Sequence, residues 1–190
     1  MTREELDAAG NTDEYVCYES QMLRVWRAYA GIVQIGKKKG TPMTLKNVRS
    51  NSLALLTTRL PNAKDKERFI FAAFLVKDNY EGDGMEEGYV EADEKYRIQL
   101  SLEEAKILKF WDYYFNPNKP ERTVFGSGLH RYLTDVQAAQ ILSRISIIKS
   151  GTKEEKISKE FYEYYCKIKG LNADDIAEPN GALKRIGREI

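Results

Sequence analysis

The feature that most constrains this fold is the segment RFIFAAFLV at residues 68–76, which is apolar after its first residue. Phenylalanine and β-branched residues favour strands, because their side chains pack well on a pleated surface. A strand without alternating polar residues is typically covered on both faces. We therefore expect a buried strand here, in a chain of 190 residues that can bury a full core without a metal or a disulfide.

Three further segments have the composition of strands. The segment LRVWRAYAGIVQI (23–35) mixes aromatic and β-branched residues, which favours at least one strand, although its start fits a helical turn equally well. SLALLTTRL (52–60) has the pattern of a buried strand, and YVEADEKYRIQL (89–100) ends in alternating apolar and polar residues. Because short turns join these strands, we expect a mostly antiparallel, curved sheet.

Three capping-box patterns predict where helices begin in the second half of the chain. In a capping box, each side chain accepts a hydrogen bond from the backbone N–H of the other residue. The pairs are Ser101 with Glu104, Thr134 with Gln137, and Thr152 with Glu155. The first helix is expected to run to about Tyr114 and stop near Asn116-Pro117. The third is expected to end at Gly170, a typical left-handed cap.

These segments predict an α+β fold with a curved, mostly antiparallel sheet or partly open β-barrel flanked by helices, and a helical C-terminal extension. Residues 1–21 are expected to form an N-terminal lead-in, 22–150 the α+β domain and 151–190 the extension. The two cysteines, Cys17 and Cys166, lie far apart in the sequence. Free thiols in a reducing compartment are therefore expected, and with them a cytoplasmic location.

Charge is distributed unevenly along the chain. The window from Gln21 to Leu60 has no Asp or Glu and eight basic residues, which are Arg24, Arg27, Lys37, Lys38, Lys39, Lys46, Arg49 and Arg59. From Asp78 to Glu104 the balance reverses, with ten acids against two basic residues. Such a field can steer an anionic ligand toward one face. Alternatively, an acidic strand pairs with a basic one and cancels the separation.

A dense aromatic patch could supply stacking surfaces. It consists of Phe110, Trp111, Tyr113, Tyr114 and Phe115, and two asparagines follow at Asn116 and Asn118. One face of a helix cannot bury all five rings, so some of Trp111, Tyr113 and Tyr114 are expected to line a surface or a pocket. Aromatic planes stack on bases, contributing roughly 1–3 kcal/mol each, while nearby amides read the base edge. The alternative is a large aromatic core with tyrosine hydroxyls at its rim.

Two other segments combine aromatic and basic side chains. Trp26 lies between Arg24 and Arg27, and GSGLHRYLTD (126–135) precedes a helix start that favours anions. The candidate nucleic-acid-binding residues are therefore Arg24, Trp26, Arg27, Lys37, Lys38, Lys39, Arg59, Trp111, Tyr113, Tyr114, Asn116, Ser127, His130 and Arg131.

Motifs of several catalytic classes are missing from the sequence. It contains neither a P-loop nor a G-x-G-x-x-G fingerprint. His130, the only histidine, does not have zinc-ligand spacing with the cysteines, so no metal site and no cofactor are expected. The acidic loop at 78–88 could hold a divalent cation, but it lacks the calcium-loop pattern and we favour solvated charges. We expect a binding protein rather than an enzyme.

The order of these segments resembles the PUA-like superfamily, which includes the EVE, YTH and ASCH domains. The resemblance covers about residues 22–148 and is carried by SLALLTTRL, RFIFAAFLV with the acidic NYEGD turn, KYRIQL and RYLTDVQAAQIL. Members of this superfamily are curved β-barrels flanked by helices, and many bind nucleic acid. EVE and YTH members hold a modified base in an aromatic-lined pocket. The resemblance implies such a fold and ligand, whereas the candidate residues come from side-chain chemistry alone.

The function expected from these features is non-catalytic binding of DNA or RNA, or of a modified nucleotide. A basic face would contact phosphates and an aromatic-lined pocket would take a base. One alternative is a protein-interaction or regulatory subunit that docks a protein partner through the C-terminal helices at residues 152–170. A third hypothesis is a metal-dependent nuclease using carboxylates between Glu81 and Glu94. No membrane association is expected, because no apolar run reaches the roughly 20 residues of a spanning helix.

Overall fold

The computed structural model describes residues 21–33, 36–43, 45, 48–60, 62–78, 88–125 and 130–186. Within them the elements are, in order, α2 (Gln21–Val25), β1 (Arg27–Tyr29), β2 (Leu53–Thr58), η1 (Asp65–Glu67), β3 (Phe69–Val76), β4 (Tyr89–Gln99), α3 (Leu102–Ile107), η2 (Phe110–Asp112), α4 (Asp135–Ile148), α5 (Glu155–Lys169), η3 (Ala173–Asp175) and α6 (Ala182–Ile186). Here η denotes a short 3₁₀ helix. The predicted α+β class is confirmed. None of the helices in these ranges combines the length and apolar character needed to cross a membrane.

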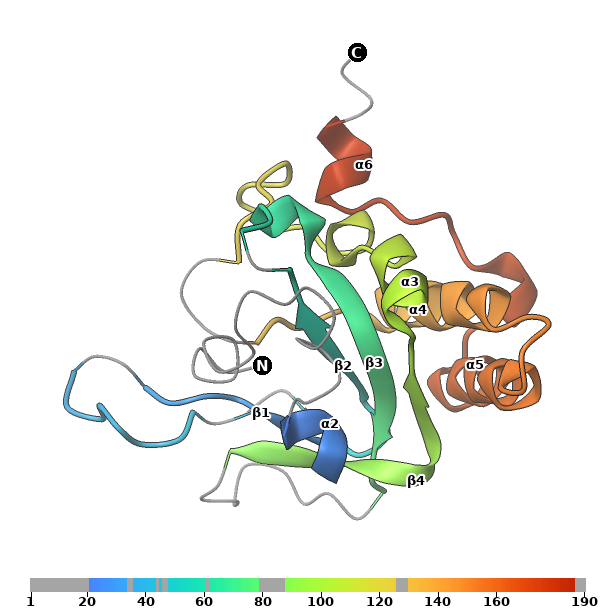
Figure 1. The fold of residues 1–190 in the computed structure, drawn as a ribbon, viewed down its shortest axis with the longest axis horizontal. Coiled ribbons are helices and arrows are strands. Elements are labelled where there is room, and N and C mark those ends of the chain that lie inside the picture. The colour runs from blue at the N-terminus through green and yellow to red at the C-terminus, as the bar shows by residue number, and fades with distance from the viewer. Residues whose placement is uncertain are drawn as a thin grey trace.

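The strands form one antiparallel sheet in the order β1-β4-β3-β2. Register shifts between Leu56 and Thr57, and between Phe74 and Val76, add local twist. The sheet curls into a half-barrel, and its two edge strands contact each other (Figure 1). The predicted curved antiparallel sheet is therefore confirmed.

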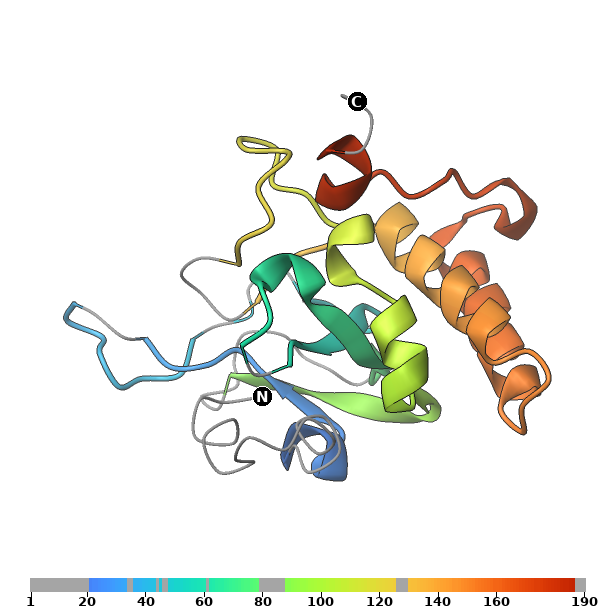
Figure 2. The same cartoon turned by 45° about the horizontal axis from the view of Figure 1, so that its top comes forward.

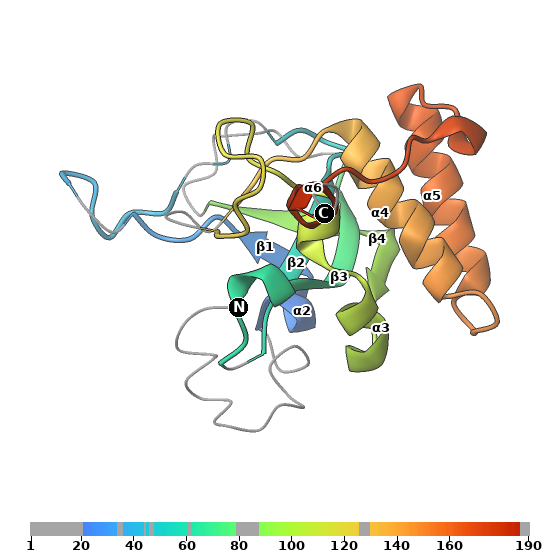
Figure 3. The ribbon, with the colours of Figure 1, turned by 90° about the horizontal axis from the view of Figure 1, so that it is seen from above.

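The buried strand predicted from RFIFAAFLV is β3, and all eight of its residues are buried. It has neighbours on both edges, β2 and β4, and α3 packs against it. Helices α4 and α5 lie side by side outside β4 (Figure 3). Phe161 and Tyr165 of α5 are buried in the same hydrophobic cluster as Phe71 and Phe74 of β3. The helical C-terminal region and the sheet thus share one core.

Two of the three predicted capping boxes are present. Ser101 Oγ accepts from Glu104 N at 3.2 Å, and Thr134 Oγ1 accepts from Gln137 N at 3.2 Å, each with the reciprocal bond. The predicted end of α5 is also confirmed, since Gly170 has φ of 64°.

The third predicted capping box is wrong. Helix α5 is capped by Glu154, the Thr152 hydroxyl donates to the Lys149 carbonyl, and the Glu155 carboxylate accepts from Gly151 N. The physical reason is the Lys149 ammonium, which is buried and pairs with Glu154 at 2.7 Å. This ion pair moves the helix start beyond the position that the local pattern indicates.

The helix predicted from Ser101 to about Tyr114 ends at Ile107 instead. Beyond it, Lys109 forms a β-bridge with Phe69, and Phe110 N donates to Arg68 O at 2.9 Å. These long-range backbone bonds draw the chain out of the helix and along the end of β3. The aromatic patch therefore lies on η2 and the turn after it, not on a helix face.

The segment 23–35 combines both expected conformations, because α2 ends at Val25 and β1 covers only Arg27–Tyr29. Trp26 connects them with φ of 50°, a backbone conformation that side chains other than glycine rarely adopt. After β1, residues 30–33 and 36–43 form an arm that projects from the sheet (Figures 1 and 3). The arm is held by a bridge between Ile32 and Pro42. We call this segment the basic arm, because Lys37, Lys38 and Lys39 are exposed on it.

Candidate ligand-binding pocket

A pocket of about 300 Å³ lies between η2, the start of α4 and the segment before α6. Figure 2 shows these three parts of the chain next to one another. Four aromatic side chains line the pocket, those of Tyr113, Tyr114, Phe115 and Tyr132. Three side-chain amides also line it, those of Gln137, Gln140 and Asn180. The volume is at the lower end of the range for small-molecule sites.

Hydrogen bonds from η1 and α4 fix the aromatic side of the pocket. Trp111 Nε1 donates to the Asp65 carbonyl at 2.6 Å and anchors η2 on η1. Gln137 Nε2 donates to the Tyr113 carbonyl at 2.9 Å, and Gln137 Oε1 accepts from Thr134 N at 2.9 Å. Both ends of the Gln137 amide are therefore used within the protein, and this side chain positions the wall.

The opposite wall comes from the segment before α6, which docks on η2 through its backbone. Gly181 N donates to Asp112 O at 2.8 Å, and Ala182 N donates to Tyr114 O at 3.0 Å. A Cβ at position 181 would lie 2.5 Å from the Tyr113 nitrogen, so only glycine fits there. This docking places Asn180 in the pocket, a role that nothing in the local sequence predicts.

Asn180 has the least satisfied side chain in the pocket. Its Oδ1 is buried and has no hydrogen-bond partner among the described residues. Its backbone carbonyl accepts from Arg185 Nε at 3.0 Å, and the Arg185 guanidinium lies 4.0 Å from the centre of the Phe115 ring. An unpaired buried acceptor costs roughly 1–3 kcal/mol, so such an atom is a natural partner for a donor on a ligand.

The Tyr113 hydroxyl remains protonated at neutral pH. Burial, together with the nearby Asp112 carboxylate, raises the pKa of Tyr113 to about 12. The phenol therefore enters the pocket as a neutral group that can both donate and accept.

Tyr113 and Tyr114 bear out the expectation that part of the aromatic patch lines a pocket. Trp111 does not, because it is 1% exposed and packed between Phe110, Tyr114 and Phe125. Its ring offers no free face for a base, and its expected stacking role is corrected here. The structure makes Trp111 a core residue because its indole N–H finds a backbone partner in η1.

Three other candidate residues lie close to the pocket without lining it. The His130 ring meets Tyr132 edge to face at 5.3 Å, and its Nδ1 is buried without a hydrogen-bond partner among the described residues. Arg131 lies 4.5 Å from the ring centre of Phe125. Asn116 is exposed just before Pro117, which belongs to the lining. Ser127 lies outside the described residues.

Trp26 lies far from this pocket, beside β1. Its ring meets Phe74 edge to face at 6.3 Å, and the Arg97 guanidinium lies 5.3 Å from its centre. Figure 1 shows α2, which ends just before Trp26, at one end of the sheet and α6 at the other. Because Trp111 is enclosed, the two tryptophans do not face a common cleft.

The basic residues of the first third do not gather into one face. Arg27 pairs with Glu91 of β4 at 2.5 Å, and Lys77 pairs with the same carboxylate at 2.9 Å. The alternative of an acidic strand beside a basic one thus holds at this position. Arg59 donates to the Ala63 carbonyl, and Arg24 is exposed on α2. The exposed lysines of the basic arm extend away from the sheet (Figure 1).

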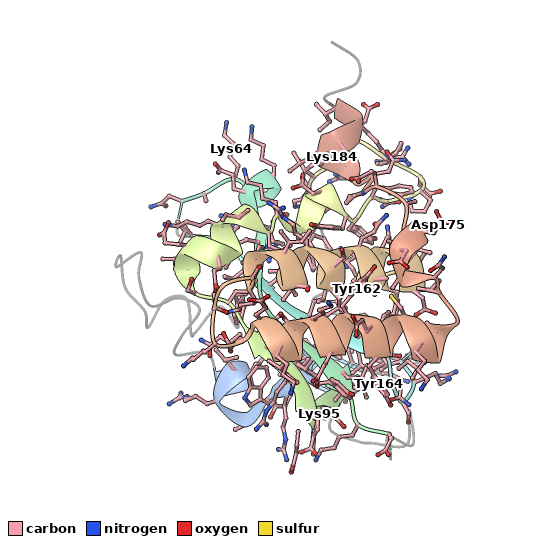
Figure 4. All side chains as sticks on the ribbon, turned by 90° about the vertical axis from the view of Figure 1, so that its right-hand side faces the viewer. Lys64, Lys95, Tyr162, Tyr164, Asp175 and Lys184 are labelled. Atoms are coloured by element: carbon pink, nitrogen blue, oxygen red, sulfur yellow. The ribbon has the colours of Figure 1, made fainter. Side chains whose placement is uncertain are left out.

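The apolar stripe of α5, considered as a docking face for a protein partner, is used within the chain. Phe161 and Tyr165 are buried, and Tyr164 stacks on Tyr96 of β4 at 4.4 Å. Figure 4 shows Tyr164 and Lys95 close together beside α5, and the Lys95 ammonium lies 4.9 Å from the centre of the Tyr96 ring.

Within the described ranges, no three or more His, Cys, Asp or Glu side chains gather in a group that could hold a metal ion. The predicted loop carboxylates from Glu81 to Glu87 lie outside these ranges. Comparisons with protein-family models, with curated proteins and with solved structures give no match.

Proposed function

We propose that the protein binds nucleic acid or nucleotides by taking a base into the pocket between η2, α4 and Asn180. The observation that carries this proposal is the buried, unpaired Asn180 Oδ1 inside a pocket with aromatic walls. Stacking on aromatic rings and hydrogen bonding at the base edge are the two interactions by which proteins hold unpaired bases.

Cationic groups support the same ligand class. Arg185 contacts both Phe115 and Asn180, so its guanidinium lies at the edge of the pocket. Its terminal nitrogens have no hydrogen bond to the described residues and are available for a phosphate. The exposed Lys37, Lys38 and Lys39 of the basic arm add attraction for a longer strand, which would weaken as salt is raised.

The test is binding at low salt, measured by fluorescence anisotropy with labelled single-stranded DNA and RNA and by calorimetry with mononucleotides. Tyr114→Ala should weaken binding about tenfold, because it removes one stacking surface. Tyr164→Ala is the matched control, since this half-buried tyrosine stacks on Tyr96 outside the pocket. Absence of binding to every oligonucleotide and mononucleotide would overturn the proposal.

A further inference from the structure

We propose that this pocket selects bases that carry an exocyclic amino group, such as adenine and cytosine. This inference rests on the proposed function and concerns which base the same site accepts. It follows from the hydrogen-bonding capacity that the pocket leaves unused.

Asn180 supplies the first acceptor. Its Oδ1 is the buried amide atom without a partner among the described residues, while its backbone is held on both sides by Arg185 and η2. The side chain therefore cannot relieve its unpaired oxygen by moving the segment that carries it. A ligand N–H directed at this oxygen would remove the cost of burying it unpaired.

Gln140 supplies the second acceptor. Its side chain is 8% exposed, and its Nε2 donates to the Ala177 carbonyl at 2.6 Å. That bond commits the amino end of the amide to the protein. Its Oε1 receives no hydrogen bond from the residues that the structure describes. Gln140 thus presents an oxygen, and not a nitrogen, to a ligand.

The other polar groups of the lining do not offset this bias. Gln137 is bonded at both ends, and the Thr134 hydroxyl accepts from Gln137 N. The Tyr113 hydroxyl is neutral and can act in either direction. The fixed, unpaired groups are therefore two oxygens, which favour an amino group and oppose a carbonyl at the same place.

The experiment compares ligands that differ only in the amino group. Adenosine monophosphate is compared with purine riboside monophosphate, and cytidine monophosphate with the 2-pyrimidinone riboside monophosphate, by calorimetry. Each amino-bearing nucleotide should bind about tenfold or more tightly than its amino-free analogue, because the analogue leaves the buried acceptor unpaired. Equal affinities within both pairs would overturn the inference and leave the proposed function intact, whereas no binding at all would overturn both.

A variant assigns the preference to Asn180. Asn180→Ala should bring the two members of each pair to within about twofold of each other, with the amino-free nucleotides bound as before. Asn118→Ala is the matched control, because Asn118 is exposed and outside the pocket lining. A full preference that persists in Asn180→Ala would contradict the role of this residue.

The same chemistry can come from a free nucleotide or from a base within a strand. A short oligothymidylate with one central adenine, compared with the same strand carrying a central unsubstituted purine, distinguishes the two sources. Preference for adenine in both formats means that the pocket reads the base alone. Preference confined to the mononucleotides identifies a free nucleotide as the ligand. Its absence in both formats counts against the inference.

Discussion

Gly181 packs so closely on the backbone of Tyr113 that a Cβ at position 181 would lie 2.5 Å from the Tyr113 nitrogen. The same glycine donates its N–H to the Asp112 carbonyl. This contact joins the C-terminal segment to η2, so the two walls of the pocket depend on one residue that has no side chain.

Gly181→Ala should therefore destabilise the protein by about 2–3 kcal/mol, because the new methyl group meets backbone that cannot turn aside. Urea unfolding measures the loss. Gly151→Ala is the comparison: it should cost only about 1 kcal/mol from its left-handed φ, since nothing lies near a Cβ there. A Gly181→Ala protein as stable as the wild type would contradict the close contact.

Lys149→Met should destabilise the protein more than any exposed lysine substitution. The Lys149 ammonium is buried and pairs with Glu104 at 2.8 Å and Glu154 at 2.7 Å. Its removal leaves two carboxylates side by side, and we expect a loss of roughly 2–4 kcal/mol, reduced by their partial access to solvent. Lys106→Met, which breaks the exposed pair with Glu103, should cost less than about 1 kcal/mol in the same urea titration.

Glu91 should make the stability pH-dependent on the acid side. Hydrogen bonds from Lys77, and then from Arg27, lower the pKa of Glu91 below its ordinary value of 4.5. A carboxyl whose folded pKa is lowered stabilises the protein above its unfolded pKa, and this contribution disappears as pH falls through the folded pKa. Glu91→Gln should therefore be less stable than the wild type at neutral pH, and this difference should shrink in acid. A difference that is constant across pH would exclude the effect.

Replacing Lys37, Lys38 and Lys39 of the basic arm by glutamine should reduce the salt dependence of oligonucleotide binding. The slope of log affinity against log salt should fall by roughly 0.7 for each phosphate that the arm no longer neutralises. Mononucleotide affinity should stay unchanged, because the arm projects away from the body of the protein (Figure 3). The triple replacement of Lys153, Lys156 and Lys159, exposed residues at the start of α5, changes the charge equally and controls for long-range electrostatics.

Asn180→Ala should leave the free protein as stable as the wild type or make it slightly more stable. Its Oδ1 accepts no hydrogen bond from the described residues, so the substitution only removes a buried unpaired oxygen. Thermal unfolding without ligand measures this directly. A large loss of stability would mean that the side chain serves the fold and not a ligand.

Local patterns predicted those parts of the fold that local forces determine. The apolar run became β3, and two capping boxes mark the starts of α3 and α4, because each depends on residues close in sequence. The end of α3 was wrong because Lys109 bridges Phe69, which is distant in the sequence. The pattern at Thr152 was overridden by an ion pair to the buried Lys149.

The candidate site was predictable in composition but not in position. Tyr113 and Tyr114 were identified as pocket residues from the density of aromatic side chains around them. Asn180 was missed, because its place depends on backbone bonds between Gly181 and Asp112 that no spacing rule encodes. Trp26 and Trp111 were grouped by chemistry, whereas the fold buries one and places the other beside Arg97.

The docking of the segment before α6 also sets an order of events during synthesis. A ribosome makes the sheet, η2 and α4 before it adds Asn180 and Gly181, and domains fold from their N-terminal parts first. The nascent chain can therefore bury most of its core while one wall of its pocket has not yet been translated. Ligand binding would begin only when that late segment docks, so the capacity to bind reports that the chain has been made at least as far as α6.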